Sequence, residues 1–556
     1  MKFRLLTILF LITTAYVFPQ AEYVPYNHSV YDFLQRMDAK GFISNYNSFE
    51  RPQTRAKISE FLKQLKEHYS ELNKVDKQIL EDYRSEFELE LYGTQNNATS
   101  VLGSPDYNFF SPKEKYFYKM VDSSKFTLFI NVTGDMESIL NRDNDSKLTK
   151  SAAFTRWGGT IRGTILNKFG YYMKATNGRF WGQRSISRSI NELKFNYKFN
   201  ANPNEVTATD YFDNTEGYFT LDYDLIKFKI GRDYKQIGYG QYKTILDVNT
   251  PQFDYVSFDF NYKIFSFSYF HGKLLGQSSV RSDSIQGEIN SVDSKYIGYH
   301  RLGFNFSKDF TLGIGEMIVY ANRPIDLSYL NPFNFYKGTE HANQDRDNSF
   351  LFFDFSNNSI QGLKLFGSVL IDDIDFGKIG SGWYGNQLAY NFYLFSSNLY
   401  DIAPIDLKFQ YLRIEPFVYT HRIFDNNYSN LGYSLVSPIK PNSELFYLGL
   451  SYHPYYRLGI NLDLTYSIHG ANQVNEQGTI VKNFGGDPNV GHRPFDQENV
   501  FFLDGVHEYL RSIAFSAVFE PIRNYFVSGK LVFENSDFGN SPGNYVAAFA
   551  LLNLRL

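Results

Sequence analysis

The sequence predicts an all-β transmembrane barrel that follows a small N-terminal α-helical bundle, and three observations carry this prediction. The chain has 556 residues and is very rich in aromatic side chains, with 54 Phe and 44 Tyr. It begins with the pattern of an export signal. From about residue 125 onward, apolar residues alternate with polar ones, as they do in the strands of membrane barrels.

Composition narrows the classes of protein. Because the chain has no Cys, disulfides, Cys-bound metals and thiol nucleophiles are excluded. Its formal net charge is −4 and it has no concentrated basic face, so we expect no nucleic-acid partner. The His residues lack ligand spacing, and we find neither an H-E-x-x-H motif nor a nucleophile elbow. The sequence therefore predicts no metal, no cofactor and no catalytic residue.

Residues 1–21 are interpreted as a signal peptide. Lys2 and Arg4 precede an apolar run from Leu5 to Val17. This run has the length of an export signal but is too short for a membrane-spanning helix, which needs roughly 20 residues. Cleavage is expected between Ala15 and Ala21, and the alternative is a buried N-terminal helix. No later stretch is apolar enough for a helical span, so the sequence predicts none.

Residues 22–95 are predicted to form a periplasmic helical segment. Val30, Phe33, Leu34 and Met37 have helical spacing, and Gly41 ends the run. A second amphipathic helix is expected from Thr54 and a third from Asn73. Part of this segment also loosely resembles a single S-layer-homology repeat. We expect these helices to pack on each other or against the end of the barrel, and residues 27–92 to be the contact for peptidoglycan or periplasmic proteins.

Residues 125–556 are predicted to form an outer-membrane β-barrel, and residues 96–124 a linker or first strand region. The clearest strand is residues 458–468, in which every second side chain is apolar. The last strand has the same pattern from Val546 to Leu556. Dividing the barrel by roughly 24 residues per strand and loop gives about 16 to 20 strands. A large soluble β-sandwich is the alternative.

Five stretches occur in one order along the chain: Tyr23 to Arg55, Gly231 to Gly240, Leu330 to Asp354, Leu370 to Asp373, and a strand from Phe409 to His421 around Glu415. Their order and spacing resemble the Wzi-type capsule-assembly family of outer-membrane proteins. The resemblance implies about 18 antiparallel strands with a periplasmic helical bundle. It also implies a lectin-like role in retaining capsular polysaccharide at the cell surface, without chemistry.

The candidate polysaccharide-binding site combines carboxylates, amides and aromatic rings. Its residues are Asn331, Glu340, His341, Asp347, Asn348, Asp354, Arg179 and Trp181. We expect the segment from Asn331 to Asp354 to fold into or over the barrel mouth. The alternatives are a loop whose buried polar groups satisfy each other, and, for Arg179 and Trp181, an interfacial anchor.

A second set of charged and polar residues is expected to line the lumen. We predict that Arg232, Asp233, Gln236 and Glu415 form a polar network across it. A phosphate cradle at Gly238-Tyr239-Gly240 is the weaker interpretation, because no helix signal follows and the Walker spacing is absent.

The leading functional interpretation is a non-enzymatic protein of the bacterial outer membrane that binds surface or capsular polysaccharide. Its other expected partner is outer-membrane lipid. One alternative is a porin-like channel for small polar or anionic solutes. Another is an outer-membrane hydrolase, for which paired carboxylates such as Asp372-Asp373 are too weak a signal.

Overall fold

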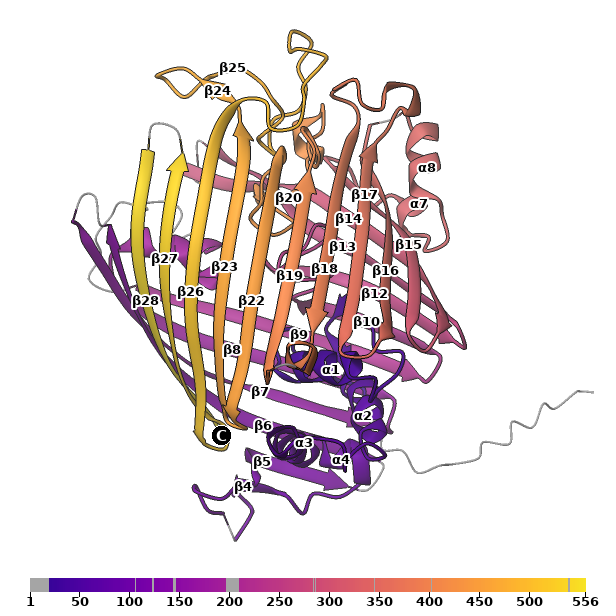
Figure 1. Cartoon of the computed structure of the whole chain (residues 1–556), viewed down its shortest axis with the longest axis vertical. Coiled ribbons are helices and arrows are strands. Elements are labelled where there is room, and N and C mark those ends of the chain that lie inside the picture. The colour runs from indigo at the N-terminus through magenta and orange to yellow at the C-terminus, as the bar shows by residue number, and fades with distance from the viewer. Residues whose placement is uncertain are drawn as a thin grey trace, which may run out of the picture.

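A computed structural model describes residues 20–105, 107–122, 125–143, 147–196, 210–283, 285, 287–344, 346–401, 403–538 and 541–556. The expected signal peptide falls largely on residues 1–19, which lie outside the described residues. The chain forms a barrel of long tilted strands with helices at the end that has the short turns (Figure 1). None of the described helices is long and apolar enough to cross a membrane.

Eighteen long antiparallel strands form the closed ring, which confirms the predicted fold class. The barrel closes where β28 pairs with β6, with Val546 opposite Arg142. The strands are β6 (Phe126–Asp143), β7 (Thr149–Ile165), β8 (Phe169–Gly182), β9 (Asp210–Tyr223), β10 (Ile226–Asp233), β12 (Phe253–Tyr262), β13 (Phe265–Asp283), β14 (Gly287–Ser307), β15 (Phe310–Ala321), β16 (Asn348–Ile360), β17 (Leu363–Asp373), β18 (Gln387–Ser396), β19 (Ile405–Ile414), β22 (Ser443–Tyr455), β23 (Leu458–Ala471), β26 (Val506–Ile522), β27 (Tyr525–Phe538) and β28 (Ser541–Arg555).

Two further strands extend the sheet beside the lower part of β6. They are β4 (Ala98–Leu102) and β5 (Glu114–Asp122), which lie in the region 96–124. β5 is antiparallel to β6, whereas β4 and β5 are parallel to each other.

The alternating pattern places one face of each strand outward and the other in the lumen. In β23, Leu464 pairs with Leu448 and Ile513 on the outer face. Its neighbour Asp463 faces the lumen, where it accepts a hydrogen bond from the Tyr447 hydroxyl at 2.5 Å. The wall is therefore apolar outside and polar inside along this strand, as a membrane barrel requires.

The N-terminal helices are present and close the end of the barrel that has short turns (Figure 1). They are α1 (Val30–Ala39), α2 (Arg55–Gln64), α3 (Lys74–Glu86) and the short α4 (Glu88–Tyr92). Thr54 and Asn73 cap α2 and α3 by accepting backbone N–H bonds. The apolar faces of the helices form one buried cluster. Ion pairs such as Arg36–Asp406, at 3.3 Å, and Lys364–Asp38 join the helices to the barrel.

The remaining elements are short. Paired strands are β1 (Tyr23–Val24) with β3 (Gln53–Thr54), β2 (Glu50–Arg51) with β11 (Gln236–Ile237), β20 (Ser429–Asn430) with β21 (Tyr433–Ser434), and β24 (Gln473–Val474) with β25 (Ile480–Lys482). Short helices are η1 (Arg184–Ser189), α5 (Asn191–Lys194), α7 (Leu327–Leu330), α8 (Tyr336–Ala342), η2 (Phe376–Lys378), α9 (Asn398–Asp401) and η3 (Phe424–Asn426).

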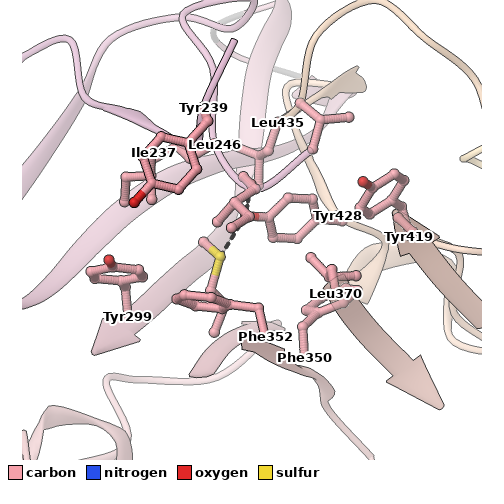
Figure 2. Close-up of a cluster of buried hydrophobic side chains, with 14 of the residues drawn as sticks. Ile237, Tyr239, Leu246, Tyr299, Phe350, Phe352, Leu370, Tyr419, Tyr428 and Leu435 are labelled. Carbon is pink, nitrogen blue, oxygen red and sulfur yellow. Dashed lines mark hydrogen bonds between the residues drawn. The ribbon is translucent and has the colours of Figure 1, made fainter. Parts of the chain in front are cut away.

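Two long connections fold into the lumen and fill part of it. We call residues 234–252 and 415–442 the inner loops. Figure 2 shows Tyr239, Leu246, Tyr428 and Leu435 from these loops packed against side chains of the barrel wall. This corrects the predicted strand from Phe409 to His421. β19 ends at Ile414 because the chain turns inward there, with Phe417 and Tyr419 at positive φ.

A third long connection folds outward, against the outer face of the barrel wall. We call residues 322–344 with 346 and 347 the outer flap. Figure 1 shows its helices α7 and α8 at the outside of the barrel wall. Tyr329 and Tyr336 of the outer flap pack on Ile318 and Tyr320 of β15. These two positions face outward, because Met317 and Val319, which alternate with them, belong to the lumen core. The expectation that this segment covers the barrel mouth is therefore wrong.

Candidate functional site

The lumen has two unlike halves, and the half enclosed by β10 to β22 is filled. Its centre is an ion pair in which the Arg301 guanidinium donates two hydrogen bonds to Asp354, at 2.7 and 2.8 Å. The Tyr239 hydroxyl donates a third bond to Asp354 at 3.1 Å. Aromatic rings surround this pair, with the Arg301 guanidinium 4.5 Å from the centre of the Phe49 ring. This half is a packed core.

The other half, lined by β6 to β9 and β23 to β28, carries charged pairs next to one smaller apolar cluster, and we call it the polar half. Across β6 and β7, Arg156 pairs with Asp135 at 3.3 Å, and it reaches Glu192 at 2.6 Å. Across β8 and β9, Lys174 pairs with Glu216 at 3.0 Å. The lumen-facing Lys530 of β27 is exposed, so this side has open space next to the wall.

A polar cavity of about 240 Å³ lies where the N-terminal segment meets the first inner loop. Its lining comes from residues 26–35, residues 48–51, residues 236–243, and Tyr393 and Lys408 of the barrel wall. Pairing of β2 with β11 holds the second and third of these segments together. Positive φ at Gly238 and Gly240 turns the loop back against the wall, where a side chain at 240 would meet Gln410.

Tyrosines lie around this cavity and beside it in the polar half. Tyr26, which lines the cavity, contacts Tyr234 edge to face at 5.4 Å between ring centres. Tyr172 and Tyr218 stack at 4.9 Å. The Tyr242 hydroxyl lies 3.1 Å from the Thr465 hydroxyl. Such side chains present an apolar ring together with a hydroxyl, which is the combination that a sugar ring requires.

The charges at the cavity are mostly positive. It is lined by Arg51, Lys243 and Lys408, with Asp32 as the acidic side chain among them. Burial lowers the pKa of Lys243 to about 8; Asp247 opposes this shift and Arg51 adds to it. The charge of Lys243 is therefore poorly solvated.

The structure divides the predicted binding segment among three environments. Asn331 and His341 are exposed on the outer flap. Glu340 and Asp347 are buried beneath it, where Asp347 pairs with Arg323 at 2.6 Å and Glu340 bonds to Ser349. Asn348 and Asp354 face the lumen from β16. The prediction that these six residues form one site is wrong, because the segment passes from the outer wall into a strand whose side chains alternate.

Arg179 and Trp181 do not join that segment. They lie on the outward face of β8, because the intervening Phe180 is buried in a lumen cluster. The Arg179 guanidinium lies 5.1 Å from the Trp181 ring and 5.6 Å from the Tyr211 ring. This placement corrects the binding prediction and agrees with the alternative of an interfacial aromatic anchor.

The four residues of the predicted lumen network also lie in different places. Asp233 is in the lumen, bonded to Lys229 at 2.5 Å and to the Tyr255 hydroxyl at 2.5 Å. Gln236 donates to Asp247 at 2.9 Å and lines the cavity. Arg232 lies on the opposite face of β10 and pairs with the exposed Asp254. Glu415 bonds to Arg413 at 2.6 Å on the outer side of the rim. The prediction is therefore wrong for Arg232 and Glu415.

Gln236 is the predicted lumen residue that lines the cavity, whereas the cations of the cavity were not predicted. Arg51, Lys243 and Lys408 are far apart in the chain and match no motif. The available signal is the long connection around Gly238 and Gly240, which directly follows Arg232 and Asp233 of the predicted lumen network. A connection that contains Tyr239, Ile245 and Leu246 must bury these side chains, and the lumen is where it does so.

The site offers no arrangement for hydrolysis or metal chemistry in the part of the chain that the structure describes. Residues 539–543 have the spacing G-x-S-x-G, which corrects the sequence prediction that the chain has no nucleophile-elbow motif. In hydrolases this motif places serine between a strand and a helix. Ser541 is instead the first residue of β28, so the helix of that motif is lacking. No group of three or more described His, Asp or Glu residues is placed to hold a metal ion.

The barrel and its apolar outer face define the chain as an outer-membrane β-barrel protein. The model of the capsule assembly protein Wzi family matches residues 130–541. The chain therefore belongs to the Wzi capsule-assembly family.

A similar solved structure is Wzi of Escherichia coli, an outer-membrane protein involved in group 1 capsule assembly and described as a carbohydrate-binding β-barrel. It is 11% identical, with a TM-score of 0.57, and the match covers 96% of this chain and 99% of that chain. OccAB4 of Acinetobacter baumannii has a TM-score of 0.43 and is 10% identical over 77% of this chain and 98% of its own. OccK1 of Pseudomonas aeruginosa has a TM-score of 0.42 and is 8% identical over the same shares. Among curated protein sequences, none matches.

Proposed function

We propose that this protein binds surface polysaccharide in its lumen and so retains capsule at the cell, without catalysing a reaction. The observation that carries the proposal is the cavity with its tyrosines and charged side chains, which opens between the helical unit and an inner loop. Membership of the capsule-assembly family supports it, as does the carbohydrate-binding description of the Escherichia coli protein.

Retention is favoured over diffusion through the barrel, because the helical unit and the inner loops occupy the lumen. A porin-like channel needs a continuous aqueous path. We therefore expect the purified barrel in planar bilayers to conduct far less than an open porin. Porin-sized conductance that is blocked by neither sugars nor polysaccharide would favour the channel interpretation.

The orientation follows from the lengths of the connections. Outer-membrane barrels have short turns on the periplasmic side and long loops outside. The helical unit lies among the short turns, so it is periplasmic and available to peptidoglycan or periplasmic proteins. Protease added to intact cells should leave residues 27–92 uncut, whereas cleavage there would reverse the orientation.

Binding is tested with two pairs of tyrosines. The double variant Tyr26→Ala/Tyr242→Ala removes lumen rings, and the control Tyr211→Ala/Tyr223→Ala removes two exposed rings of β9. Capsular polysaccharide binding to detergent-purified protein is measured by biolayer interferometry, with heat-modifiable gel mobility as the check of folding. We expect the lumen variant to lose about tenfold in affinity and the control to match the wild type. Equal binding by all three proteins would contradict the proposal.

A further inference from the structure

The cavity concentrates cations that have few acidic partners. Among the described residues, the Arg51 guanidinium has no carboxylate within ion-pair distance and lies 4.6 Å from the Tyr31 ring. Lys408 approaches Asp32 only to 3.9 Å. Lys243 donates to the backbone carbonyl of Gly240. Three cations therefore face one acidic side chain in this cavity.

The nearest additional acid is already engaged. Asp247 is close enough to affect Lys243, but its two oxygens accept hydrogen bonds from Gln236 and Ser437. Lys243 itself is 8% exposed. A buried cation without a full partner is unfavourable, and an anion that enters the cavity would offset that cost.

The start of α1 adds to the positive character of the cavity. His28, Ser29 and Asp32 line it at the first turn of this ten-residue helix. Ser29 at the N-cap makes no side-chain capping bond, but the backbone N–H of Val30 donates to His28 Nδ1 at 3.2 Å, so only part of the positive end of the helix dipole is available to the cavity. The Asp32 side chain is 70% exposed, which shows that it projects into open space rather than into packed protein.

We propose that this cavity is a subsite for the oxyanion of an acidic sugar unit, with Arg51, Lys243 and Lys408 as its cationic contacts. The inference rests on the proposed polysaccharide binding and deepens it by naming the substrate class. Pockets for drug-sized ligands have roughly 300–1,000 Å³, so about 240 Å³ admits a single sugar unit rather than an oligosaccharide.

The experiment compares acidic and neutral glycans on the full-length purified barrel. The probes are a glucuronic acid–N-acetylglucosamine tetrasaccharide, a mannose 6-phosphate disaccharide and a neutral N-acetylglucosamine tetramer. We expect the wild type to prefer one or both acidic probes over the neutral probe, with an affinity that falls as salt rises. A carboxylate source and a phosphate source are distinguished by which acidic probe binds.

Arg51→Gln and Lys408→Gln should each weaken the preferred acidic probe by about tenfold and leave the neutral probe unchanged. Arg51→Lys should recover part of the loss. Arg232→Gln removes a cation from the outer face of the barrel and is the matched control, with no expected effect. Asp32→Asn, which removes the competing carboxylate, should strengthen binding of the acidic probe severalfold, an increase that misfolding cannot produce.

Four outcomes overturn the inference. If the cavity variants weaken acidic and neutral probes equally, or if Arg51→Gln matches Arg232→Gln, the cavity is not an oxyanion subsite although polysaccharide binding stands. If the wild type binds the neutral probe as tightly as the acidic ones, the inference fails in the same way. If the wild type binds no probe and no capsular polysaccharide, the proposed function fails and the subsite fails with it.

Discussion

The inner loops and the outer flap are both long, tyrosine-rich connections at the same end of the barrel, yet they fold to opposite sides of the wall. The inner loops pack on lumen positions such as Met317 and Val319 of β15. The outer flap packs on Glu316, Ile318 and Tyr320, the positions that alternate with them. We infer that the side chains on the two faces of β15 determine the side of the wall on which each connection folds. At β15 the outward positions include a carboxylate and a tyrosine, and the outer flap covers them and supplies hydrogen bonds that lipid cannot.

The two regions differ in how their polar groups are satisfied. In the lumen, Arg301 and Asp354 form a fully buried pair. Beneath the outer flap, Glu316 accepts backbone N–H bonds from Tyr336 and Lys337 at 2.9 and 3.2 Å, and His300 lies 3.0 Å from it. The free side of the outer flap is apolar, with Leu327 77% exposed and Phe333 76% exposed. Such a surface fits contact with the outer leaflet of the membrane, next to the wall.

The largest effect is expected from breaking the lumen pair. Asp354→Ala leaves the Arg301 cation buried without its partner, which costs about 3–5 kcal/mol. Urea unfolding in detergent, followed by heat-modifiable mobility, measures this loss. Asp254→Ala, which removes the exposed partner of Arg232, is the control and should change stability by less than about 0.5 kcal/mol. A similar small loss for both variants would show that the filled half of the lumen does not stabilise the barrel.

A charge on the lipid side of the wall should cost somewhat less. Leu464→Arg places a cation on the outer face of β23, and we expect a loss of about 2–4 kcal/mol if the position is near the membrane midplane. Leu464→Phe keeps the position apolar and is the matched control. Stability in liposomes, measured by the same urea titration, tests the assignment. Full tolerance of Arg at 464 would mean that this face does not contact lipid.

Sequence patterns predicted the barrel and its helices, because those patterns are local. Alternation in residues 458–468 and helical spacing from Val30 to Met37 each report a surface that must be buried on one side. They do not report which way a connection turns. Asp347, Asn348 and Asp354 are neighbours in the chain, yet the outer flap covers the first while the other two face the lumen. The cavity depends on Arg51, Lys243 and Lys408, which only tertiary folding brings together.

The attachment of the outer flap to the wall can be tested with a substitution that should destabilise the barrel less. Glu316→Ala removes the acceptor of two backbone N–H groups in the flap, and unpaired buried donors cost about 1–3 kcal/mol. We expect the flap to open, so that trypsin cuts faster at Lys337 or Arg346 while the barrel keeps its heat-modifiable mobility. His341→Ala, an exposed position on α8, is the control. Unchanged cleavage would mean that Tyr329 and Tyr336 hold the flap without Glu316.

The smallest effect concerns pH and the loop of residues 472–505, which hydrogen-bonds to the second inner loop at Phe417 and Asn442. Burial alone would raise the pKa of Asp496, but hydrogen bonds from Arg493 and Asn483 hold it below its ordinary value. Because the folded-state pKa is lowered, this contact stabilises the loop at pH values above the unfolded pKa of about 3.9, and the stabilisation is lost as pH falls through the folded value.

Hydrogen exchange at residues 483–496 should therefore rise between pH 4 and pH 2.5, after correction for intrinsic rates. Asp496→Asn should remove that pH dependence, while Asp487→Asn nearby should leave it intact. Identical profiles for the wild type and Asp496→Asn would show that another group controls the loop.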